Sequence, residues 1–282
     1  MVRIVADTST MYSPKQAEEA GFSVSPLAVT IAGSTYRELD EITGDEFIRL
    51  IGEGNMPRSS QPAMGDVLDV YQQYEGEEIL NIAMADGLSG TYSTAVMAAE
   101  NCGREKEITV INSGTLCGPH RYLVETAVKL AAKGQGLKEI KVKIEKLMQS
   151  EKSFLVPSDF DYLRRGGRLS PLVSFVGKTI KLAPVLTLSE DHRQLVMSGV
   201  KRSFKQALTH IGKELTQHGV GSGWKVYVAH AGASELAAQA KAAMQELFPA
   251  VKAEIFPLTP AFITQGGPGC VAVQVIRECG EV

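Results

Sequence analysis

Five polar segments, each punctuated by glycine or proline, interrupt the apolar pattern of this sequence. They are residues 7–10, 58–62, 87–92, 162–168 and 264–269. Each lies at the end of an apolar run or before a predicted helix, which is where α/β proteins bind ligands. In the first, Asp7 has two interpretations. It could orient other polar groups at the edge of a sheet, or its carboxylate could fix a turn by accepting hydrogen bonds from backbone N–H groups.

The two serine-containing segments could bind an anion. Around Ser89, backbone N–H groups at a helix start, a hydroxyl and the missing Cβ of Gly90 would form a pocket for a carboxylate or a phosphate. Ser59 and Ser60 could donate hydrogen bonds to the same kind of ligand. Both segments could instead only cap helices or form turns. Ser89 is a poor candidate nucleophile, because residues 87–90 lack the GxSxG pattern and no histidine is placed by sequence to activate it.

An arginine beside a glycine pair marks the fourth segment. Arg168 follows Gly166 and Gly167, so its guanidinium could approach a carboxylate or a phosphoryl group closely. The alternative is that Arg168 forms a salt bridge between domains. The fifth segment contains Gln265 and Gly267 and could be only a tight turn before the last strand.

The elements around the first three segments are typical of a Rossmann-like α/β domain. Short apolar, β-branched runs alternate with helical patterns, which favours a largely parallel sheet covered by helices. We predict strands at residues 2–6, 79–84 and 108–112 and helices at residues 66–74, 92–102, 121–133 and 137–149.

The second half has a different pattern. Residues 184–188 and 194–199 flank the polar turn of residues 190–193 and predict a β-hairpin. Further strands are predicted at residues 225–229, 253–258 and 271–276, with two amphipathic helices that contain Leu208 and Met244. We therefore expect an N-terminal Rossmann-like parallel-sheet domain, residues 1–157, and a C-terminal α/β domain with a mixed or antiparallel sheet, residues 158–282.

Composition excludes several classes of protein. With 282 residues, of which 44% are hydrophobic and 22% charged, the chain can build a sizeable core and is not expected to be disordered. A net charge of −3 without a basic cluster makes nucleic acid a poor partner. The apolar run at the N-terminus is too short for a signal peptide or a membrane span, and the four cysteines lack CxxC spacing. We expect a cytoplasmic protein without a structural zinc site.

In their order and spacing, these segments resemble the DegV family along essentially the whole chain. Residues 4–10 are similar to that family's first strand with its Asp-Ser/Thr end, and Ser59-Ser60-Gln61-Pro62 resembles its Thr-Ser-Gln-Pro segment. Residues 88–92, Leu-Ser-Gly-Thr-Tyr, match the corresponding family segment without change. Residues 162–168 and 183–186 resemble its Tyr-Leu-x-x-Gly-Gly-Arg region and the strand that follows.

The resemblance implies a long-chain fatty acid, such as palmitate, stearate or oleate, that lies between the two domains with only its carboxylate at the surface. In the family two hydroxyls hydrogen-bond this carboxylate, and their positions fall on Ser59 and Ser89. The residues expected to support the head group are Ser60, Gly90, Thr91, Arg168, Gln265 and Gly267. No cofactor or metal is implied.

The resemblance also implies a partner. Better-studied members are the acyl-binding subunit of a two-component fatty acid kinase, in which an ATP-bearing subunit phosphorylates the carboxylate. The sequence agrees with this division, because it has no GxxxxGK[ST] loop. We therefore expect a lipid-binding subunit that is not an enzyme by itself, does not span a membrane and contacts one at most transiently.

Three positions depart from the family pattern. Ser59 stands in place of a threonine and keeps the hydroxyl. Asp86 places a carboxylate near the proposed anion site and Gln265 replaces a histidine, and these two changes leave other functions open. Glutamine can hydrogen-bond a carboxylate but cannot carry charge or shuttle a proton. One alternative is a regulatory lipid-binding member without transfer competence. The other is a stand-alone phosphotransferase or hydrolase that acts on a small anionic substrate.

Overall fold

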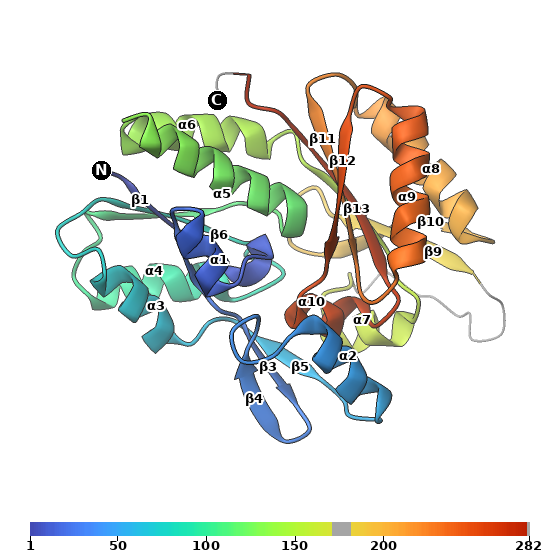
Figure 1. Ribbon diagram of the computed structural model, residues 1–282, viewed down its shortest axis with the longest axis horizontal. Helices are drawn as coiled ribbons and strands as arrows, with labels where there is room; N and C mark the ends of the chain where they lie inside the picture. The colour runs from blue at the N-terminus through green and yellow to red at the C-terminus, as the bar shows by residue number, and fades with distance from the viewer. Residues whose placement is uncertain (171–181, 281–282) are drawn as a thin grey trace.

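The computed structural model describes residues 1–170 and 182–280, whose strands form three sheets (Figure 1). A parallel sheet of four strands occupies the N-terminal half, and a mixed sheet of six strands occupies the C-terminal half. A small antiparallel sheet of three strands adjoins them. The predicted α/β class, with a parallel sheet followed by a mixed one, is confirmed. None of the described helices is both long and apolar enough to cross a membrane.

The parallel sheet has the order β2-β1-β6-β7 and is buried on both faces. Its strands are Ser23–Ser25 (β2), Arg3–Asp7 (β1), Ile79–Ala83 (β6) and Ile108–Asn112 (β7). Successive side chains of a strand point to opposite faces, so Ile4 and Val5 enter two different hydrophobic clusters. Every residue of β6 is buried, as expected for a parallel strand covered by helices on both sides. The three predicted strands are confirmed.

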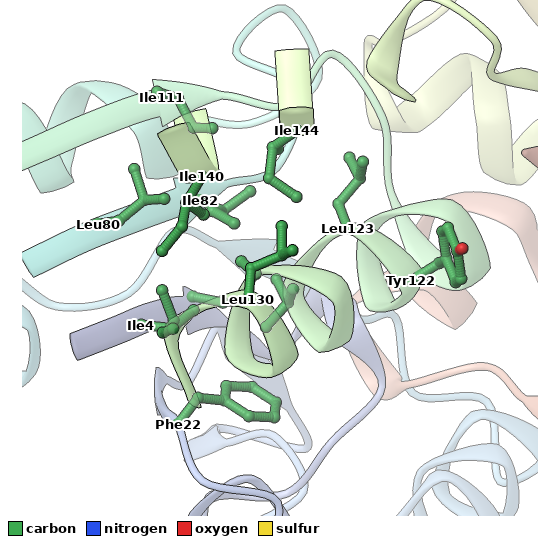
Figure 2. Packing of buried hydrophobic residues seen from close by; sticks show 14 of the residues in the cluster. Ile4, Phe22, Leu80, Ile82, Ile111, Tyr122, Leu123, Leu130, Ile140 and Ile144 are labelled. Carbon is green, nitrogen blue, oxygen red and sulfur yellow. The ribbon is translucent and has the colours of Figure 1, made fainter. Parts of the chain in front are cut away.

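Helices cover both faces of the parallel sheet. On one face, Leu123 and Leu130 of α5 and Ile140 and Ile144 of α6 pack on the sheet (Figure 2). On the other face lie α3 and α4, where Tyr71 is fully buried. The helices are Met64–Gln72 (α3), Thr91–Asn101 (α4), Cys117–Ala132 (α5) and Leu137–Met148 (α6), close to the predicted ranges. Gly134 has a φ of 79°, and this left-handed conformation follows the end of α5.

The small antiparallel sheet, of order β4-β3-β5, was not predicted. Its strands are Ala28–Ile31 (β3), Ser34–Arg37 (β4) and Arg58–Ser60 (β5). The segment around Ser59 is therefore a short strand paired with β3, rather than a loop before a helix. Nearby lie three short helical elements: Thr8–Thr10 (η1), Pro14–Glu19 (α1) and Gly44–Gly52 (α2).

The mixed sheet has the order β10-β9-β8-β13-β11-β12. Its strands are Lys152–Val156 (β8), Ala183–Leu188 (β9), Leu195–Lys201 (β10), Trp224–His230 (β11), Lys252–Pro257 (β12) and Val271–Arg277 (β13). Only β11 and β12 pair in parallel among these described strands. The predicted hairpin is confirmed as β9 and β10, which pair antiparallel.

Helices α8 (Phe204–Gln217) and α9 (Ser234–Leu247) cover one face of the mixed sheet. The opposite face turns toward the N-terminal half, where the short helices α7 (Phe160–Gly166) and α10 (Pro260–Gly266) lie beside each other (Figure 1). The proposed domain boundary at residue 157 stays a prediction. Strand β8, which precedes it, pairs with β13 and β9 in the mixed sheet.

Candidate functional site

An apolar cavity lies between the two halves of the molecule. The space between its walls is about 730 Å³, with the open solvent at its mouth included. The N-terminal half contributes Met84, Leu88, Leu116 and Cys117. The mixed sheet and the adjoining helices contribute Phe154, Leu155, Leu163, Leu188, Leu195, Leu258, Phe262, Cys270 and Ala272. Such a wall excludes water and suits an apolar chain.

Polar side chains interrupt this wall at more than one place, and at one of them Arg168 and Gln265 face the cavity. The same two residues also line a surface cleft that contains Ser59. We call Ser59, Arg168 and Gln265 the head-group cluster. The cluster therefore separates an apolar interior from a polar surface hollow, and all three of its residues are partly buried.

Gln265 positions the Ser59 hydroxyl. Its Nε2 donates a hydrogen bond to Ser59 Oγ over 2.9 Å, which leaves the hydroxyl hydrogen of Ser59 free to be donated elsewhere. Gln265 Oε1 is buried and has no hydrogen-bond partner among the described residues. A buried amide oxygen without a partner costs free energy. Rotation of the amide by 180° would place a donor at that position.

Arg168 joins the two halves without an ion pair. Its Nε donates to the carbonyl oxygen of Leu88 over 3.1 Å, and its Nη1 donates to the carbonyl of Gly166. Within the described part of the chain Nη2 has no partner, and no carboxylate pairs with the guanidinium. Burial lowers the pKa of Arg168, yet an arginine stays charged at neutral pH. The salt-bridge alternative is thus replaced by hydrogen bonds to backbone carbonyls.

Ser89 lies close to this region but does not line the cavity. Its hydroxyl is 2.7 Å from Thr91 Oγ1 and accepts a hydrogen bond from the backbone N–H of Thr91 at the start of α4. A Cβ on Gly90 would lie 3.2 Å from the side chain of Gln61. The missing side chain of Gly90 therefore lets the segments of Ser59 and Ser89 approach each other.

The remaining predicted residues have structural positions. Ser60 is exposed and pairs with Ala28 in the small sheet. Gly267 has a φ of 77°, and a Cβ there would lie 2.8 Å from the ring of Tyr162. Only glycine fits this turn without strain, and the turn holds α10 against α7.

Asp86 is paired with Arg193 and is not among the residues that line the cavity. Its Oδ2 accepts a hydrogen bond from Arg193 Nη1 over 2.8 Å, so the β9–β10 turn contacts the loop after β6. A Cβ on Gly87 would lie 2.1 Å from the Cα of Arg193, so this contact requires a glycine. His192, from the same turn, donates through Nδ1 to the carbonyl of Gly114 over 2.6 Å.

The comparisons with known proteins agree with one another. A family model described as "Uncharacterised protein, DegV family" matches residues 1–278. The chain belongs to the DegV family. A DegV domain-containing protein of Staphylococcus aureus (strain N315) is 30% identical over 281 residues, which is 98% of each chain.

Solved structures of DegV proteins share the whole fold. A DegV family protein from Thermus thermophilus, described for its fatty acid binding, superposes on this chain with a TM-score of 0.87. It is 25% identical and covers 98% of this chain and 99% of its own. DegV of Bacillus subtilis, described as a fatty acid binding protein, has a TM-score of 0.85 at 24% identity and covers 98% and 99% of the two chains.

The DegV chain contains a second polar group on the cavity wall that the sequence did not predict. Ser153 and Gln274 face the cavity from β8 and β13, and Glu151 lies behind them. We call these three residues the buried polar cluster. Gln274 Nε2 donates to Ser153 Oγ over 2.8 Å and to the carbonyl of Leu116 over 3.0 Å. The sequence signal that could have revealed this cluster is Gln274, a polar residue inside the apolar run of residues 271–276.

Within the buried polar cluster, both donors and the acceptor of the Gln274 side chain have hydrogen-bond partners. Its Oε1 accepts a hydrogen bond from the backbone N–H of Gly118 over 3.2 Å, and Ser153 donates to Glu151. Burial raises the pKa of Glu151, and Nδ1 of His192 lies 3.8 Å from its carboxylate. These contacts tie the mixed sheet to the start of α5.

The polar groups after β1 are structural as well. Asp7 accepts hydrogen bonds from the backbone N–H groups of Ser9 and Met84, each over 2.9 Å, and so fixes the turn. Ser9 Oγ and His120 Nδ1 form a serine–histidine pair, but both residues are fully buried. A substrate could not reach this pair, and Ser89 has no histidine partner among the described residues.

Proposed function

We propose that this DegV protein binds a long-chain fatty acid with its tail in the apolar cavity and its carboxylate at the head-group cluster. One observation carries the proposal: an apolar cavity meets Arg168 and Gln265 in its wall, and Gln265 is bonded to Ser59. A cation and hydrogen-bond donors beside an enclosed apolar space match the two parts of a fatty acid.

The tail supplies affinity and the head group supplies orientation. Each buried methylene contributes about 0.8 kcal/mol, so even part of a C16 to C18 chain gives strong binding. A hydrogen bond to a charged group adds about 1.5 to 3 kcal/mol and fixes which end of the ligand points outward. In our proposal Ser59 donates its free hydrogen and Arg168 donates through Nη2. Ser89, Gly90 and Thr91 border the carboxylate, with Ser60 and Gly267 in support.

The relatives support this ligand. The Thermus thermophilus and Bacillus subtilis proteins, which share the fold over the whole chain, are both described as binding fatty acid. The cavity of the present chain lies on the face of the mixed sheet that α8 and α9 leave uncovered. Ligand and cavity are consistent in polarity, because most of the wall is apolar.

We further propose that the carboxylate is presented to a separate ATP-bearing kinase subunit in the cytoplasm. The carboxylate oxygen would attack the terminal phosphorus of ATP, ADP would leave, and an acyl phosphate would form. The sequence contains no GxxxxGK[ST] motif, and in our proposal the partner supplies the nucleotide. The head-group cluster is open to the surface cleft, so a partner could reach the carboxylate there.

The ligand is tested by extraction of the purified protein with organic solvent and mass spectrometry of the extract. We expect palmitate, stearate or oleate in a stoichiometric amount. If nothing is released and added oleate does not bind, the lipid-binding proposal is wrong and a small anionic substrate becomes the leading alternative.

The kinase step is tested separately, with a partner kinase and the variant Gln265→His. If the wild-type protein supports acyl phosphate formation, Gln265 suffices. If only Gln265→His does so, while both bind oleate equally, the wild-type protein is a regulatory lipid-binding member. The exchange keeps a hydrogen-bonding side chain next to Ser59 and adds a group that can carry a proton.

A further inference from the structure

The surface cleft beside the head-group cluster is lined by arginines. The space between its walls is about 940 Å³, with open solvent included, and the wall contains Arg58, Arg165 and Tyr162 in addition to the head-group cluster. None of the described residues in this wall is a carboxylate. Three guanidinium groups therefore share one hollow in a chain whose net charge is −3.

Arg58 and Arg165 are free to bind a ligand. Both side chains are exposed, and neither pairs with a carboxylate in the described part of the chain. Arg165 lies over the ring of Tyr162, with 4.8 Å between its Cζ and the ring centroid. This stacking orients the guanidinium without using its hydrogen-bond donors. The adjacent Arg164, by contrast, pairs with Asp161 over 3.3 Å and does not line the cleft.

Other hollows on the surface do not share this charge pattern. One beside α6 includes Glu278, one beside α1 includes Asp45, and one between α8 and α9 includes Glu246. Their arginines and lysines have acidic neighbours, whereas the arginine cleft has none among its described residues. A carboxylate ligand needs only one cation, so Arg58 and Arg165 exceed what the fatty acid requires.

We propose that this cleft is a binding site for a phosphoryl group carried on the head of the bound lipid. A phosphate monoester is a dianion with three terminal oxygens, and guanidinium groups bind such oxygens in pairs. The cleft shares Arg168 and Gln265 with the cavity, so a phosphoryl group attached to a head group at Ser59 would extend into the hollow that Arg58 and Arg165 line. The site fits an acyl phosphate, and this inference rests on the proposed function.

The test compares two lipids that differ only in the head group: palmitate and hexadecyl phosphate, which is a stable analogue of an acyl phosphate. Both are titrated into delipidated wild-type protein, the double variant Arg58→Gln/Arg165→Gln and the control Arg164→Gln. We expect the double variant to bind hexadecyl phosphate about tenfold more weakly and palmitate unchanged. The control should bind both as the wild type does. The difference in hexadecyl phosphate affinity between the wild type and the double variant should decrease at high salt, because Arg58 and Arg165 are exposed.

The outcomes separate this inference from the proposed function. If the wild type binds palmitate but the double variant binds hexadecyl phosphate as tightly as the wild type, the phosphoryl site is wrong and the fatty acid site stands. If the double variant instead loses only binding to phosphatidylglycerol vesicles, the cleft is a membrane-contact surface and the inference is also overturned. If neither lipid binds the wild type, both proposals fall.

Discussion

The cavity wall contains two polar clusters whose hydrogen bonding differs. In the buried polar cluster, Gln274 uses both of its N–H donors and its carbonyl oxygen within the protein. In the head-group cluster, Gln265 Oε1 and Arg168 Nη2 have no partner among the described residues. Polar groups whose hydrogen bonds are all made within the protein only form part of the cavity wall, because they have no free donor or acceptor for a ligand. A carboxylate can only accept hydrogen bonds, so it is expected to bind at the free donors, which are Arg168 Nη2 and the Ser59 hydroxyl.

The two clusters should respond in opposite ways to substitution. Damage to the buried polar cluster should lower the free energy of unfolding, because it leaves buried donors and acceptors unpaired. Removal of the Ser59 hydroxyl from the head-group cluster should lower ligand affinity and leave stability nearly unchanged. The comparison would be contradicted if substitutions in the buried polar cluster lowered only ligand affinity, or if substitutions in the head-group cluster lowered only stability.

The largest effect is expected for Gln274→Leu. It removes the partner of Ser153, of the carbonyl of Leu116 and of the N–H of Gly118, so we expect a loss of about 2 to 4 kcal/mol in the free energy of unfolding. Urea denaturation followed by circular dichroism measures it. The matched control Gln149→Leu, at an exposed position, should change stability by less than about 0.5 kcal/mol.

Glu38 tests how firmly the helix that carries Gln265 is held. Its carboxylate is fully buried, accepts hydrogen bonds from Thr8 Oγ1 over 2.6 Å and from the N–H of Ala261 over 2.7 Å, and so fixes the start of α10. Burial raises the pKa of Glu38 from 4.5 to about 7.

The folded state therefore holds the Glu38 proton more tightly than the unfolded chain. The associated stability is present below pH 4.5 and is lost as the pH rises through about 7, with a total of about 3 kcal/mol. Glu38→Gln should remove this dependence. The difference in unfolding free energy between variant and wild type should shift in favour of the variant from pH 4.5 to 8. Parallel curves for the two proteins would contradict the assignment.

Ser59→Ala and Ser89→Ala sharpen the description of the head-group cluster. Each exchange removes one proposed donor to the carboxylate, and we expect a loss of about 1 to 2 kcal/mol in oleate binding, measured by calorimetry. Ser59 belongs to the cluster, whereas the Ser89 hydroxyl is bonded to Thr91. Unchanged binding by Ser89→Ala would remove Ser89 from the site and leave Ser59 as its hydroxyl donor.

The smallest effect is expected for the pair of Asp86 and Arg193. This ion pair also joins the two halves, but the Arg193 side chain is 58% exposed. A double-mutant cycle with Asp86→Asn and Arg193→Gln should give a coupling of about 0.5 kcal/mol that decreases with added salt. The coupling energy could instead be as large as the loss of unfolding free energy in Gln274→Leu. In that case solvent exposure would not explain the difference between this ion pair and the buried hydrogen bonds of Gln274.

Most of the fold follows from local patterns in the sequence. The strands β6 and β7 and the hairpin of β9 and β10 were predicted because they are apolar, β-branched runs bounded by polar turns. The small sheet was missed because β4 and β5 are short and polar. Their pairing with β3 is a tertiary effect that local propensity does not report.

The site was predicted through residue types and family resemblance, but its connections were not. Ser59 and Gln265 are 206 positions apart, so their hydrogen bond could be found only in the folded chain. The partner of Asp86 is likewise a residue of a distant hairpin turn. Arg168, predicted from the sequence as a cation beside the head group, lines both the cavity and the cleft, whereas its hydrogen bond to Leu88 had no sequence signal.

The central claim is that the free donors of the head-group cluster, Arg168 Nη2 and the Ser59 hydroxyl, bind a carboxylate. Its most direct test is the ¹³C NMR titration of carboxyl-labelled oleate bound to the wild-type protein and to Arg168→Met. We predict that the carboxyl group of oleate bound to the wild-type protein has a pKa below that of free oleate, because Arg168 and Ser59 stabilise its ionised form. In Arg168→Met the pKa of the bound carboxyl group should be higher. If the bound carboxyl titrates identically in both proteins, the carboxylate does not lie at Arg168 and the account is wrong.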